Sequence, residues 1–382
     1  MSAERQRILL VTRNLPPLVG GMERLNWHIA DELSREADVR IIGPEGSSKH
    51  RPLGVSVTEV PLRPLRRFLL ASAWQARRIA RSWKPDIVLA GSGLTAPAAL
   101  IAARAINSRA CVYLHGLDVA VQHPVYRALW HPAIRRMHTV IANSQPTAKL
   151  ARALGVSAER LQIVHPGVQM PAVRQPASAL QAFRQRHGLG DARILLSVGR
   201  LTERKGLREF VQQALPVIVQ AAPDTLMAIV GDAPTDSLLA GVQTRASIQA
   251  AADAKGIGQH LRFLGVITDV AELACAYEAA NLHVFPVRQL VGDPEGFGMV
   301  AIEAAAHGLP TVAFATGGIV DAIQEDQSGR LVRPGDYAGV AQAALQVLAD
   351  GLDAWQAGSR TFAAQFAWPI LGEKMRAALF RP

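Results

Sequence analysis

Residues 294–304 read Pro-Glu-Gly-Phe-Gly-Met-Val-Ala-Ile-Glu-Ala and come shortly after the strand-like run 282–285. This order predicts a strand, a loop with two glycines and then a helix. Gly296 and Gly298 let the loop backbone approach a ligand closely, because glycine carries no side chain. The N–H groups of the first helical turn have no partner within the helix, so they can bind an anion such as a diphosphate.

Two carboxylates, Glu295 and Glu303, lie eight positions apart in this stretch. Glu295 is on the loop and Glu303 is two turns into the helix. Both side chains can therefore face one pocket and accept hydrogen bonds from sugar and ribose hydroxyls. Taken alone, the stretch is equally compatible with an ordinary helix start that carries two solvated acids.

Strand and helix signals alternate on both sides of this stretch. Strands are predicted in the second half of the chain at 194–198, 226–230, 261–264, 282–285, 311–313 and 330–332. Helices are predicted there at 207–221, 270–280, 299–307 and 337–348. Strands are predicted in the first half at 8–12, 39–42, 55–60, 87–90, 111–114 and 140–142. Apolar strands separated by helices indicate parallel sheets that are covered on both faces.

The chain is long enough for more than one domain, and its pattern restarts after a connection rich in proline and glycine at 170–191. We predict two doubly wound α/β domains that cover 1–172 and 190–365. Ligands of such sheets bind at the carboxyl ends of the strands, so the expected site is a central cleft between the domains.

The composition, with 49% hydrophobic and 19% charged residues, is that of a globular chain. The two cysteines, Cys111 and Cys275, lie in different halves. This excludes a disulfide framework and fits a reducing cytoplasm. The start of the chain lacks the pattern of a signal peptide, and no apolar run approaches the length of a membrane span. We expect a cytoplasmic protein that is soluble or at most peripheral.

The positive charge of the chain is concentrated in its first half. Residues 1–172 carry 23 Lys and Arg against 11 Asp and Glu, a net charge of +12, whereas 173–382 carry 18 against 20, a net charge of −2. A one-sided basic surface indicates a polyanionic partner, which can be nucleic acid, anionic lipid or a phosphorylated acceptor. The alternative is a solubility feature of an arginine-rich proteome.

Residues 60–84 contain no acid and carry these basic residues: Arg63, Arg66, Arg67, Arg77, Arg78, Arg81 and Lys84. Apolar side chains lie between them: Phe68, Leu69, Leu70, Trp74, Ile79 and Trp83. A second acid-free run covers 124–138. Basic amphipathic helices with tryptophan lie on anionic membranes, so Arg77, Arg78, Arg81 and Lys84 are candidate membrane contacts. Alternatively, the apolar residues are core and the arginines are merely solvated. RNA binding would need a nucleic-acid fold signature, which the sequence lacks.

Arg200 and Lys205 follow the first predicted strand of the second half, where their charges can hold a diphosphate leaving group. Alternatively, Arg200 and Lys205 are an ordinary Arg–Lys pair on the protein surface that binds no ligand. The sequence contains no Asp-x-Asp motif and no His/Cys cluster, so we expect neither a metal nor another cofactor.

Residues 91–96, Gly-Ser-Gly-Leu-Thr-Ala, have the form of a dinucleotide-binding loop. They follow the fourth strand of their domain and not the first. A redox function would also leave the pair Glu295 and Glu303 unexplained, so we disfavour it.

Further motifs accompany residues 294–304: Pro16-Pro17, Gly20-Gly21, His115-Gly116-Leu117-Asp118, Asn143-Ser144, Val164-His165-Pro166-Gly167-Val168, Ser197-Val198-Gly199-Arg200-Leu201, Lys205-Gly206, Phe263-Leu264-Gly265 and Gly317-Gly318. Together with the two glutamates, they make the chain resemble the large glycosyltransferase family 4, which has the GT-B fold, over nearly its whole length. The resemblance implies two Rossmann-like domains that face a central cleft, an N-terminal one for the acceptor and a C-terminal one for the nucleotide-sugar donor. Phe366-Ala367-Trp368 is similar to the start of the family's last helix, so 366–382 should cross back to the first domain.

The resemblance also implies roles for individual residues. Glu295 would bind sugar hydroxyls, Glu303 the ribose, and His115 the donor sugar near its 6-hydroxyl. The implied catalytic residues are His115, Arg200, Lys205 and Glu295. The implied donor contacts, besides Arg200, Lys205 and the two glutamates, are Gly20, Gly21, Val266, Gly296, Phe297, Gly298, Met299 and Val300.

Family members retain the anomeric configuration, and we favour a same-face substitution in which the leaving phosphate deprotonates the acceptor. Segment 285–300 looks similar to GDP-mannose-dependent members such as the phosphatidylinositol mannosyltransferases. It therefore points to mannose, with a UDP-hexose or UDP-N-acetylhexosamine as the alternative donor. The expected acceptor is a lipid-linked or cell-envelope glycan at the inner face of the cytoplasmic membrane. A non-catalytic GT-B binding subunit and a GT-B 2-epimerase are further alternatives, and the two glutamates disfavour the second.

Overall fold

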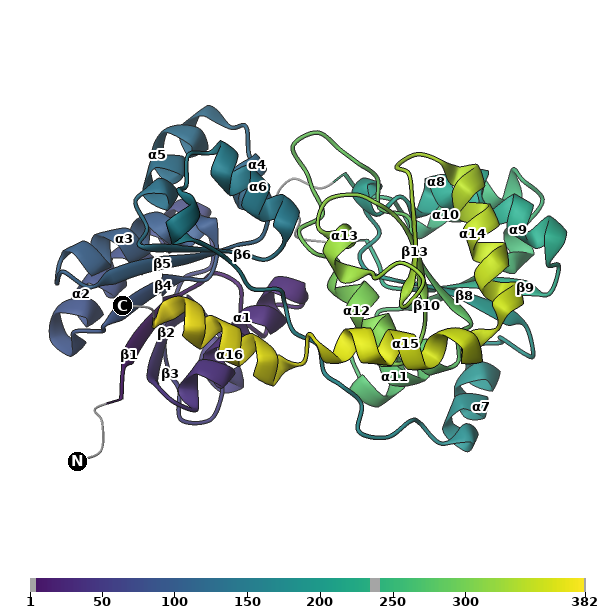
Figure 1. The fold of residues 1–382 in the computed structure, drawn as a ribbon, viewed down its shortest axis with the longest axis horizontal. Helices are drawn as coiled ribbons and strands as arrows, with labels where there is room; N and C mark the ends of the chain where they lie inside the picture. Colours follow the sequence, from purple (N-terminus) through teal and green to yellow (C-terminus); the bar gives the residue numbers. More distant parts are fainter. Residues whose placement is uncertain (1–4, 234–240, 381–382) are drawn as a thin grey trace. The chain divides into compact units, whose positions relative to one another are not determined.

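The computed structural model describes residues 5–233 and 241–380, and the chain divides into two compact units (Figure 1). The first unit ends at Gly167 and resumes at Ala367. The second unit runs from Val168 to Phe366.

Within the described residues, the first unit forms a seven-stranded parallel sheet in the order β3-β2-β1-β4-β5-β6-β7. Its strands are β1 (Arg7–Val11), β2 (Asp38–Pro44), β3 (Ser56–Val60), β4 (Ile87–Ala90), β5 (Arg109–Leu114), β6 (Thr139–Ala142) and β7 (Leu161–Ile163). The strand order reverses between β1 and β4, and such a switch point is where doubly wound sheets bind their ligands.

Helices cover both faces of this sheet (Figure 1). They are α1 (Gly21–Ser34), η1 (Ser47–His50), α2 (Leu65–Trp83), η2 (Gly93–Thr95), α3 (Ala96–Arg104), α4 (Leu117–Ala120), α5 (Pro124–Arg135), α6 (Gln145–Ala153), η3 (Ala158–Arg160) and α16 (Trp368–Leu379). On one face, α3 packs between α2 and α5, and the buried side chains of these helices share a core with Leu9, Val11 and Val88. Right-handed crossovers place α1 on the opposite face, where it packs against α16.

The second unit forms a six-stranded parallel sheet, as far as the described part of the chain shows, in the order β10-β9-β8-β11-β12-β13. Its strands are β8 (Arg193–Val198), β9 (Thr225–Val230), β10 (Leu261–Gly265), β11 (Leu282–Phe285), β12 (Thr311–Phe314) and β13 (Gly329–Val332). Here the order reverses between β8 and β11, so their carboxyl ends form the expected ligand edge.

The helices of the second unit are α7 (Ala177–Arg186), η4 (Glu203–Lys205), α8 (Leu207–Gln213), α9 (Leu215–Ala221), α10 (Arg245–Asp253), η5 (Gly258–His260), α11 (Val270–Glu278), α12 (Met299–Ala306), α13 (Ile319–Ala322), α14 (Tyr337–Asp350) and α15 (Leu352–Ala364). Helices α8, α9, α10 and α14 share one buried cluster with the sheet. Buried side chains of α7, α11, α12 and α15 belong to two further hydrophobic clusters of this unit.

The prediction of two doubly wound parallel sheets is confirmed, and every predicted strand overlaps an observed one. Strand β7 was not predicted from the sequence. The predicted helix at 207–221 is two helices that meet at Ala214, because Pro216 has no N–H with which to continue the hydrogen-bond ladder. Helix α7, expected in a connection, packs on α11 in the second unit.

Cys111 and Cys275 are both free and buried. No helix among residues 5–233 and 241–380 is long and apolar enough to cross a membrane.

The predicted C-terminal helix packs on the first unit through Trp368. The Trp368 ring stacks on His28 of α1 with a centroid distance of 3.8 Å and an interplanar angle of 11°. Burial, with Arg24 and Arg35 nearby, lowers the pKa of His28 to about 4, so the stacked imidazole is neutral near pH 7. A side chain at Gly167 would overlap the other part of the indole.

Replacing Gly167 with alanine is expected to lower the free energy of unfolding of the full chain by about 1–3 kcal/mol, because the added methyl group overpacks a filled site. Urea denaturation of wild type and Gly167→Ala measures the difference. The matched background is Trp368→Leu, which removes the indole. The glycine substitution should cost less there, and an equal cost in both backgrounds would contradict this packing.

Candidate active site

The candidate site lies at the carboxyl ends of β8 and β11, which pair with each other at the switch point of the second sheet. The loop after β8 carries Arg200 and Lys205, and the loop after β11 carries Glu295. Parallel strands end at the same edge of a sheet, so residues about 90 positions apart in sequence meet here. The structure thus brings two predicted cations and a predicted carboxylate to one place.

Glu295 is paired with two consecutive cations. The Nζ atom of Lys205 lies 2.9 Å from Oε2 of Glu295, and the Arg204 guanidinium contacts the same oxygen. Nε of Arg204 also lies 3.3 Å from Oδ1 of Asp293. Sequence reasoning missed Arg204 and Asp293, although each is next to or near a residue that it selected.

These cations are partly removed from water. Lys205 is 18% exposed and lies 4.6 Å from the ring centroid of Phe285. Burial, reinforced by Arg204 and Arg200, holds the pKa of Lys205 well below that of a free lysine. Burial likewise lowers the pKa of the Arg204 guanidinium, and Asp293 opposes this shift. Arg200 is exposed, and no carboxylate in the described ranges pairs with it.

Glycines allow the loops of the site to approach one another. A side chain at Gly206, where φ is +69°, would overlap the carbonyl oxygen of Pro286 after β11. Side chains at Gly317 and Gly318 would overlap the backbone of Glu295 and of the residue after it. The amide of Gly318 also donates a hydrogen bond to the Glu295 carbonyl at 2.8 Å. The Gly-Gly pair after β12 therefore supports the loop that presents Glu295.

The second predicted carboxylate, Glu303, is on α12. Its Oε2 accepts a hydrogen bond from the Tyr277 hydroxyl at 3.1 Å. Its charge also acts on Lys205, where it favours the ammonium form. Both glutamates thus face the same lysine, but they are held by different partners.

The remaining predicted donor contacts of the second unit lie on the loops after β10 and β11 and at the start of α12. Gly298, at φ +91°, precedes α12, and Phe297 is buried against Phe366 with a centroid distance of 5.7 Å. The Phe297 side chain is therefore core, and only its backbone can meet a ligand. Gly296 lies beside Gly318, Met299 and Val300 pack partly on the same core, and Val266 after β10 is 60% exposed.

In the first unit, His115 follows β5 and is 9% exposed. Its Nε2 lies 2.8 Å from the Gly91 carbonyl oxygen, and its backbone N–H donates to Asp118 at 2.8 Å. A carbonyl can only accept, so in this contact Nε2 carries the proton and Nδ1 is left as an acceptor. Gly91 belongs to the loop that resembles a dinucleotide site, and in the structure this loop orients His115.

Gly20 precedes α1, and Gly21 is its first residue. A side chain at Gly20 would overlap the Glu23 carboxylate, which accepts a hydrogen bond from Asn14 at 2.7 Å. The glycine pair therefore begins a helix whose first turn is already occupied by an acid, a feature that sequence reasoning missed.

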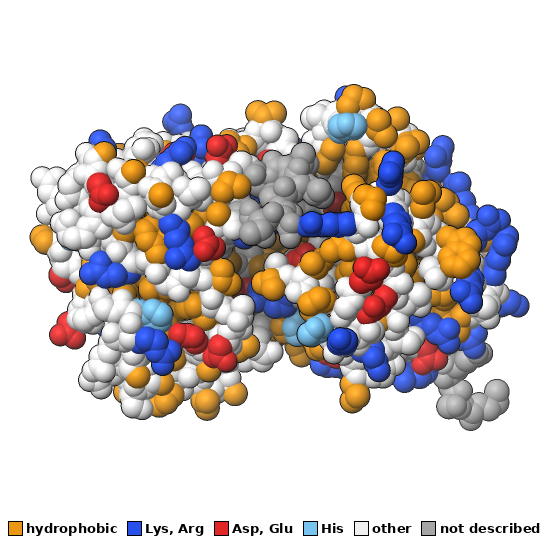
Figure 2. Space-filling model, turned by 180° about the vertical axis from the view of Figure 1, so that it is seen from behind, with side chains coloured by type: hydrophobic (Ala, Val, Ile, Leu, Met, Phe, Trp, Pro, Cys, Tyr) orange, Lys and Arg blue, Asp and Glu red, His pale blue; other side chains and the backbone are white. Residues whose placement is uncertain are grey.

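The candidate membrane residues Arg77, Arg78, Arg81 and Lys84 are exposed at the end of α2. Trp74 is 62% exposed, and its ring centroid lies 5.6 Å from the Arg78 guanidinium. Figure 2 shows Lys and Arg side chains gathered at this edge of the first unit, on the right. The sequence interpretation is corrected for Phe68, which is buried in the core, and for Leu69, Ile79 and Trp83, which pack partly on it.

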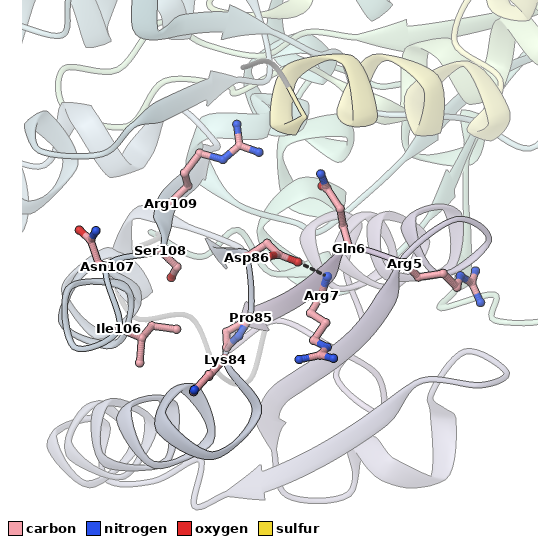
Figure 3. Close-up of a pocket in the computed structure, with 10 residues that line it drawn as sticks. All are labelled: Arg5, Gln6, Arg7, Lys84, Pro85, Asp86, Ile106, Asn107, Ser108 and Arg109. Carbon is pink, nitrogen blue, oxygen red and sulfur yellow. Dashed lines mark hydrogen bonds between the residues drawn. The ribbon is translucent and has the colours of Figure 1, made fainter. Parts of the chain in front are cut away.

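A cavity of about 820 Å³ lies beside the amino ends of β1, β4 and β5 of the first sheet. It is lined by Arg5, Gln6, Arg7, Lys84, Pro85, Asp86, Ile106, Asn107, Ser108 and Arg109 (Figure 3). Arg5 donates to two carbonyls at the end of α1, at 2.9 and 2.6 Å, and Arg7 donates to the Trp83 carbonyl at 3.2 Å. Helix C-termini leave carbonyls unpaired and partially negative, so these arginines cap helices. In Figure 3 the Arg5, Arg7 and Arg109 side chains point in different directions, and we assign no ligand site here.

The arrangement at β8 and β11 can bind a diphosphate through its cations. Its two glutamates can accept hydrogen bonds from the hydroxyl groups of a ligand. Within the described residues, no group of three or more His, Cys, Asp or Glu side chains could hold a metal ion. Two Rossmann-like sheets with such a site define a nucleotide-sugar glycosyltransferase of the GT-B fold.

Comparisons with known proteins agree with this class. The family described as "Glycosyltransferase Family 4" matches residues 19–170, and "Glycosyl transferases group 1" matches residues 192–350. The chain is 29% identical to the GDP-mannose-dependent alpha-(1-6)-phosphatidylinositol monomannoside mannosyltransferase of Mycolicibacterium smegmatis, over 90% of this chain and 89% of that one. It is 28% identical to the Mycobacterium tuberculosis enzyme of the same name, over 97% of both chains.

Among solved structures, Anabaena HepE in complex with UDP-glucose superposes with a TM-score of 0.80 at 20% identity, over 98% of this chain and 100% of that one. This confirms the GT-B fold. The chain belongs to glycosyltransferase family 4 and is a glycosyltransferase enzyme.

Nucleoside diphosphate binding is expected to take up a proton at alkaline pH. Between the lowered pKa of Lys205 and the ordinary value of 10.5, part of the free enzyme carries a neutral amine there. A bound diphosphate favours the ammonium form, so it raises this pKa and draws a proton from solvent. Calorimetric titration in buffers of different ionisation enthalpy measures the proton.

The matched variant is Lys205→Arg, which keeps the charge but does not titrate. Proton uptake should disappear in this variant. Uptake that persists in it, or none in the wild type, would show that Lys205 is not the group that meets the diphosphate.

Proposed function

We propose that the chain is a retaining, metal-independent glycosyltransferase that moves mannose from GDP-mannose to a lipid-linked or cell-envelope glycan. The observation that supports this donor is the similarity, over 90–97% of the chain, to two enzymes named as GDP-mannose-dependent. The acceptor in both names, a phosphatidylinositol monomannoside, is a glycan on a lipid and supports this acceptor class.

The cations of the second unit suit a donor diphosphate. Arg200 is exposed and can reach a ligand, whereas Arg204 and Lys205 lie deeper with their charges on Glu295. Preorganised cations stabilise the charge that grows on a leaving diphosphate, the task that a metal ion performs in other transferases. This supports a reaction that needs no metal.

Under this proposal, the bond between the anomeric carbon and the diphosphate oxygen breaks with both electrons going to the diphosphate. The acceptor oxygen forms its bond to the same face of the anomeric carbon. The acceptor hydroxyl proton passes to the departing phosphate oxygen, so no protein base is needed. Glu295 accepts hydrogen bonds from sugar hydroxyls, and Nδ1 of His115 is available as a further acceptor.

Purified enzyme is expected to transfer mannose from GDP-mannose to a phosphatidylinositol mannoside at an undiminished rate in EDTA. Radiolabelled donor and thin-layer separation of the lipid product provide the measurement. Parallel reactions with UDP-glucose and UDP-N-acetylglucosamine test the alternative donors. Loss of activity in EDTA that Mg²⁺ restores would contradict the metal-free reaction, and transfer only from a UDP-sugar would replace the donor.

Glu295→Ala and Glu303→Ala are the matched variants for this experiment. Each loses a charged hydrogen-bond acceptor, which is worth about 1.5–3 kcal/mol or roughly 10- to 100-fold in kcat/KM. Near-normal transfer by both variants would remove the basis for the donor site. The melting temperature of each variant controls for folding.

The acceptor side of the proposal rests on one face of the first unit. Helices α2, α3 and α5 lie side by side, and none of them contains an acid. Apolar side chains protrude from all three helices: Leu70, Trp74, Ile101, Val125 and Leu129. Exposed arginines surround them: Arg66, Arg67, Arg77, Arg78, Arg81, Arg104, Arg127 and Arg135. We call these residues the basic face.

Sequence reasoning singled out α2 and α5 but missed α3. Because α3 packs between them, it joins two separate acid-free runs into one surface. Apolar side chains surrounded by arginines match the interface of an anionic membrane, where lipid headgroups bind the cations and the apolar groups enter the acyl boundary. The basic face therefore supports an acceptor that is presented by a membrane.

Four substitutions, Arg77→Gln, Arg78→Gln and Arg81→Gln in the basic face and Lys84→Gln directly after α2, are expected to abolish most binding to anionic vesicles. Each cation near such a surface contributes on the order of 1 kcal/mol, and salt screens the attraction over about 10 Å. Co-sedimentation with phosphatidylglycerol-containing and purely phosphatidylcholine vesicles, at low and high salt, measures the effect. Affinity for GDP should not change, because none of the four residues is among the predicted donor contacts.

A control protein loses four exposed cations elsewhere, through Lys149→Gln, Arg152→Gln, Lys255→Gln and Arg333→Gln. It should keep most of its vesicle binding. If it loses as much as the first variant, net charge and not the basic face determines binding. Equal binding of the wild type to both vesicle types would point to a soluble anionic acceptor.

A further inference from the structure

Glu303 is held by a buried side chain that no family motif in the sequence includes. Tyr277, near the end of α11, is 2% exposed and donates its hydroxyl to Oε2 of Glu303 at 3.1 Å. Hydrogen bonds to a carboxylate are stronger than those between neutral groups. The direction in which Glu303 presents its other oxygen therefore depends on where the Tyr277 hydroxyl lies.

The Tyr277 ring is itself fixed from one side by His307. His307 lies four positions after Glu303, at the end of α12, so both side chains face α11. The two rings stack with centroids 5.3 Å apart and an interplanar angle of 10°. Nδ1 of His307 lies 2.9 Å from Oε1 of the buried Glu278 side chain. The other oxygen of Glu278 accepts a hydrogen bond from the backbone N–H of Gln175 at 2.8 Å. The stack is therefore anchored to the body of the second unit.

His283 of β11 meets Tyr277 edge-on, with centroids 6.5 Å apart and an interplanar angle of 69°. Nδ1 of His283 lies 3.0 Å from the Thr311 hydroxyl oxygen, which fixes its plane. Burial and the charge of Lys205 lower the pKa of His283 to about 3, so this ring is neutral near pH 7. The Tyr277 ring is thus enclosed on two sides by rings that cannot turn freely.

We propose that Tyr277 is the positioning residue of the donor site. Its hydroxyl fixes one oxygen of Glu303 and turns the other oxygen toward the 2′- and 3′-hydroxyls of the donor ribose. Tyr277 itself touches neither the donor nor the reacting atoms. The inference rests on the proposed function, and within it on the ribose role that the family resemblance implies for Glu303.

A purely structural hydrogen bond would have a different consequence. Its loss would lower the stability of the second unit and leave nucleotide affinity unchanged. A positioning bond preorganises the carboxylate, so its loss weakens the binding of a nucleotide that carries ribose hydroxyls. A nucleotide without these hydroxyls should not respond.

The experiment compares GDP with 2′,3′-dideoxy-GDP by calorimetric titration of wild type and Tyr277→Phe. The substitution removes one oxygen atom and keeps the ring stack. We expect the wild type to bind GDP more tightly than the dideoxy analogue. The variant should bind GDP about five- to tenfold more weakly, with little change for the analogue. In transfer assays the KM for GDP-mannose should rise by a similar factor while kcat is unchanged.

Tyr113→Phe is the matched control. Tyr113 is also buried, in the first unit, and its hydroxyl donates to the Val164 carbonyl at 2.6 Å. Its substitution should lower the melting temperature without changing GDP affinity. In a Glu303→Ala background, Tyr277→Phe should have no further effect on GDP binding, because the group that it positions has been removed.

The possible outcomes distinguish a failure of this inference from a failure of the proposed function. If the wild type prefers GDP over the analogue and Tyr277→Phe binds GDP equally well, this inference is overturned and the proposed function stands. If the wild type does not distinguish the two nucleotides, the ribose role of Glu303 is overturned and the inference falls with it. Additive effects of Tyr277→Phe and Glu303→Ala would also overturn the inference.

Discussion

The candidate site is organised around one electrostatic constraint, which is that neighbouring cations must be held together at the carboxyl ends of β8 and β11. Arg204 and Lys205 are 14% and 18% exposed, and burial, reinforced by the charge of Arg204, lowers the pKa of Lys205. Glu295 and Asp293 offset this repulsion in the free enzyme. Ion pairs that are largely withdrawn from water gain little over apolar packing. The partly buried cations of this site are therefore better explained by the binding of a ligand that carries negative charge than by a contribution to the stability of the fold.

The constraint accounts for the glycines and the topology around the site. Opposite charges must come within 3 to 4 Å to compensate for their desolvation, so the loops after β8 and β11 have to touch. Gly206 lets the first loop reach the Pro286 carbonyl, and Gly317 and Gly318 support the second loop from behind. Adjacent parallel strands at a switch point supply the shared edge, because the connecting helices leave it in opposite directions.

The sequence predicted what depends on periodicity and on residue type. Apolar runs placed the strands, and the two glutamates with Lys205 predicted a site that the structure assembles at one edge. It could not predict that Arg204 reaches Glu295 together with Lys205, because this depends on the turn of η4. Nor could it separate buried Phe68 from exposed Trp74 on α2, since both lie among arginines and only tertiary packing defines the inner face. Tyr277 was missed for a related reason, because its partner is 26 residues away and lies on another helix.

The two units use positive charge in different physical settings. In the second unit Arg204 and Lys205 are largely enclosed and paired at 2.9 to 3.3 Å, so dissolved salt screens them little. In the first unit the arginines of the basic face are exposed and have no acid on their own helices. Their field extends into solvent over about one Debye length, which is about 8 Å at physiological ionic strength. Salt should therefore act on the encounter with an anionic acceptor surface far more than on the binding of the donor. Under the proposed function, the asymmetry of charge along the chain would correspond to two separable steps, a screened, long-range approach to the acceptor and a short-range stabilisation of the leaving group that salt screens little.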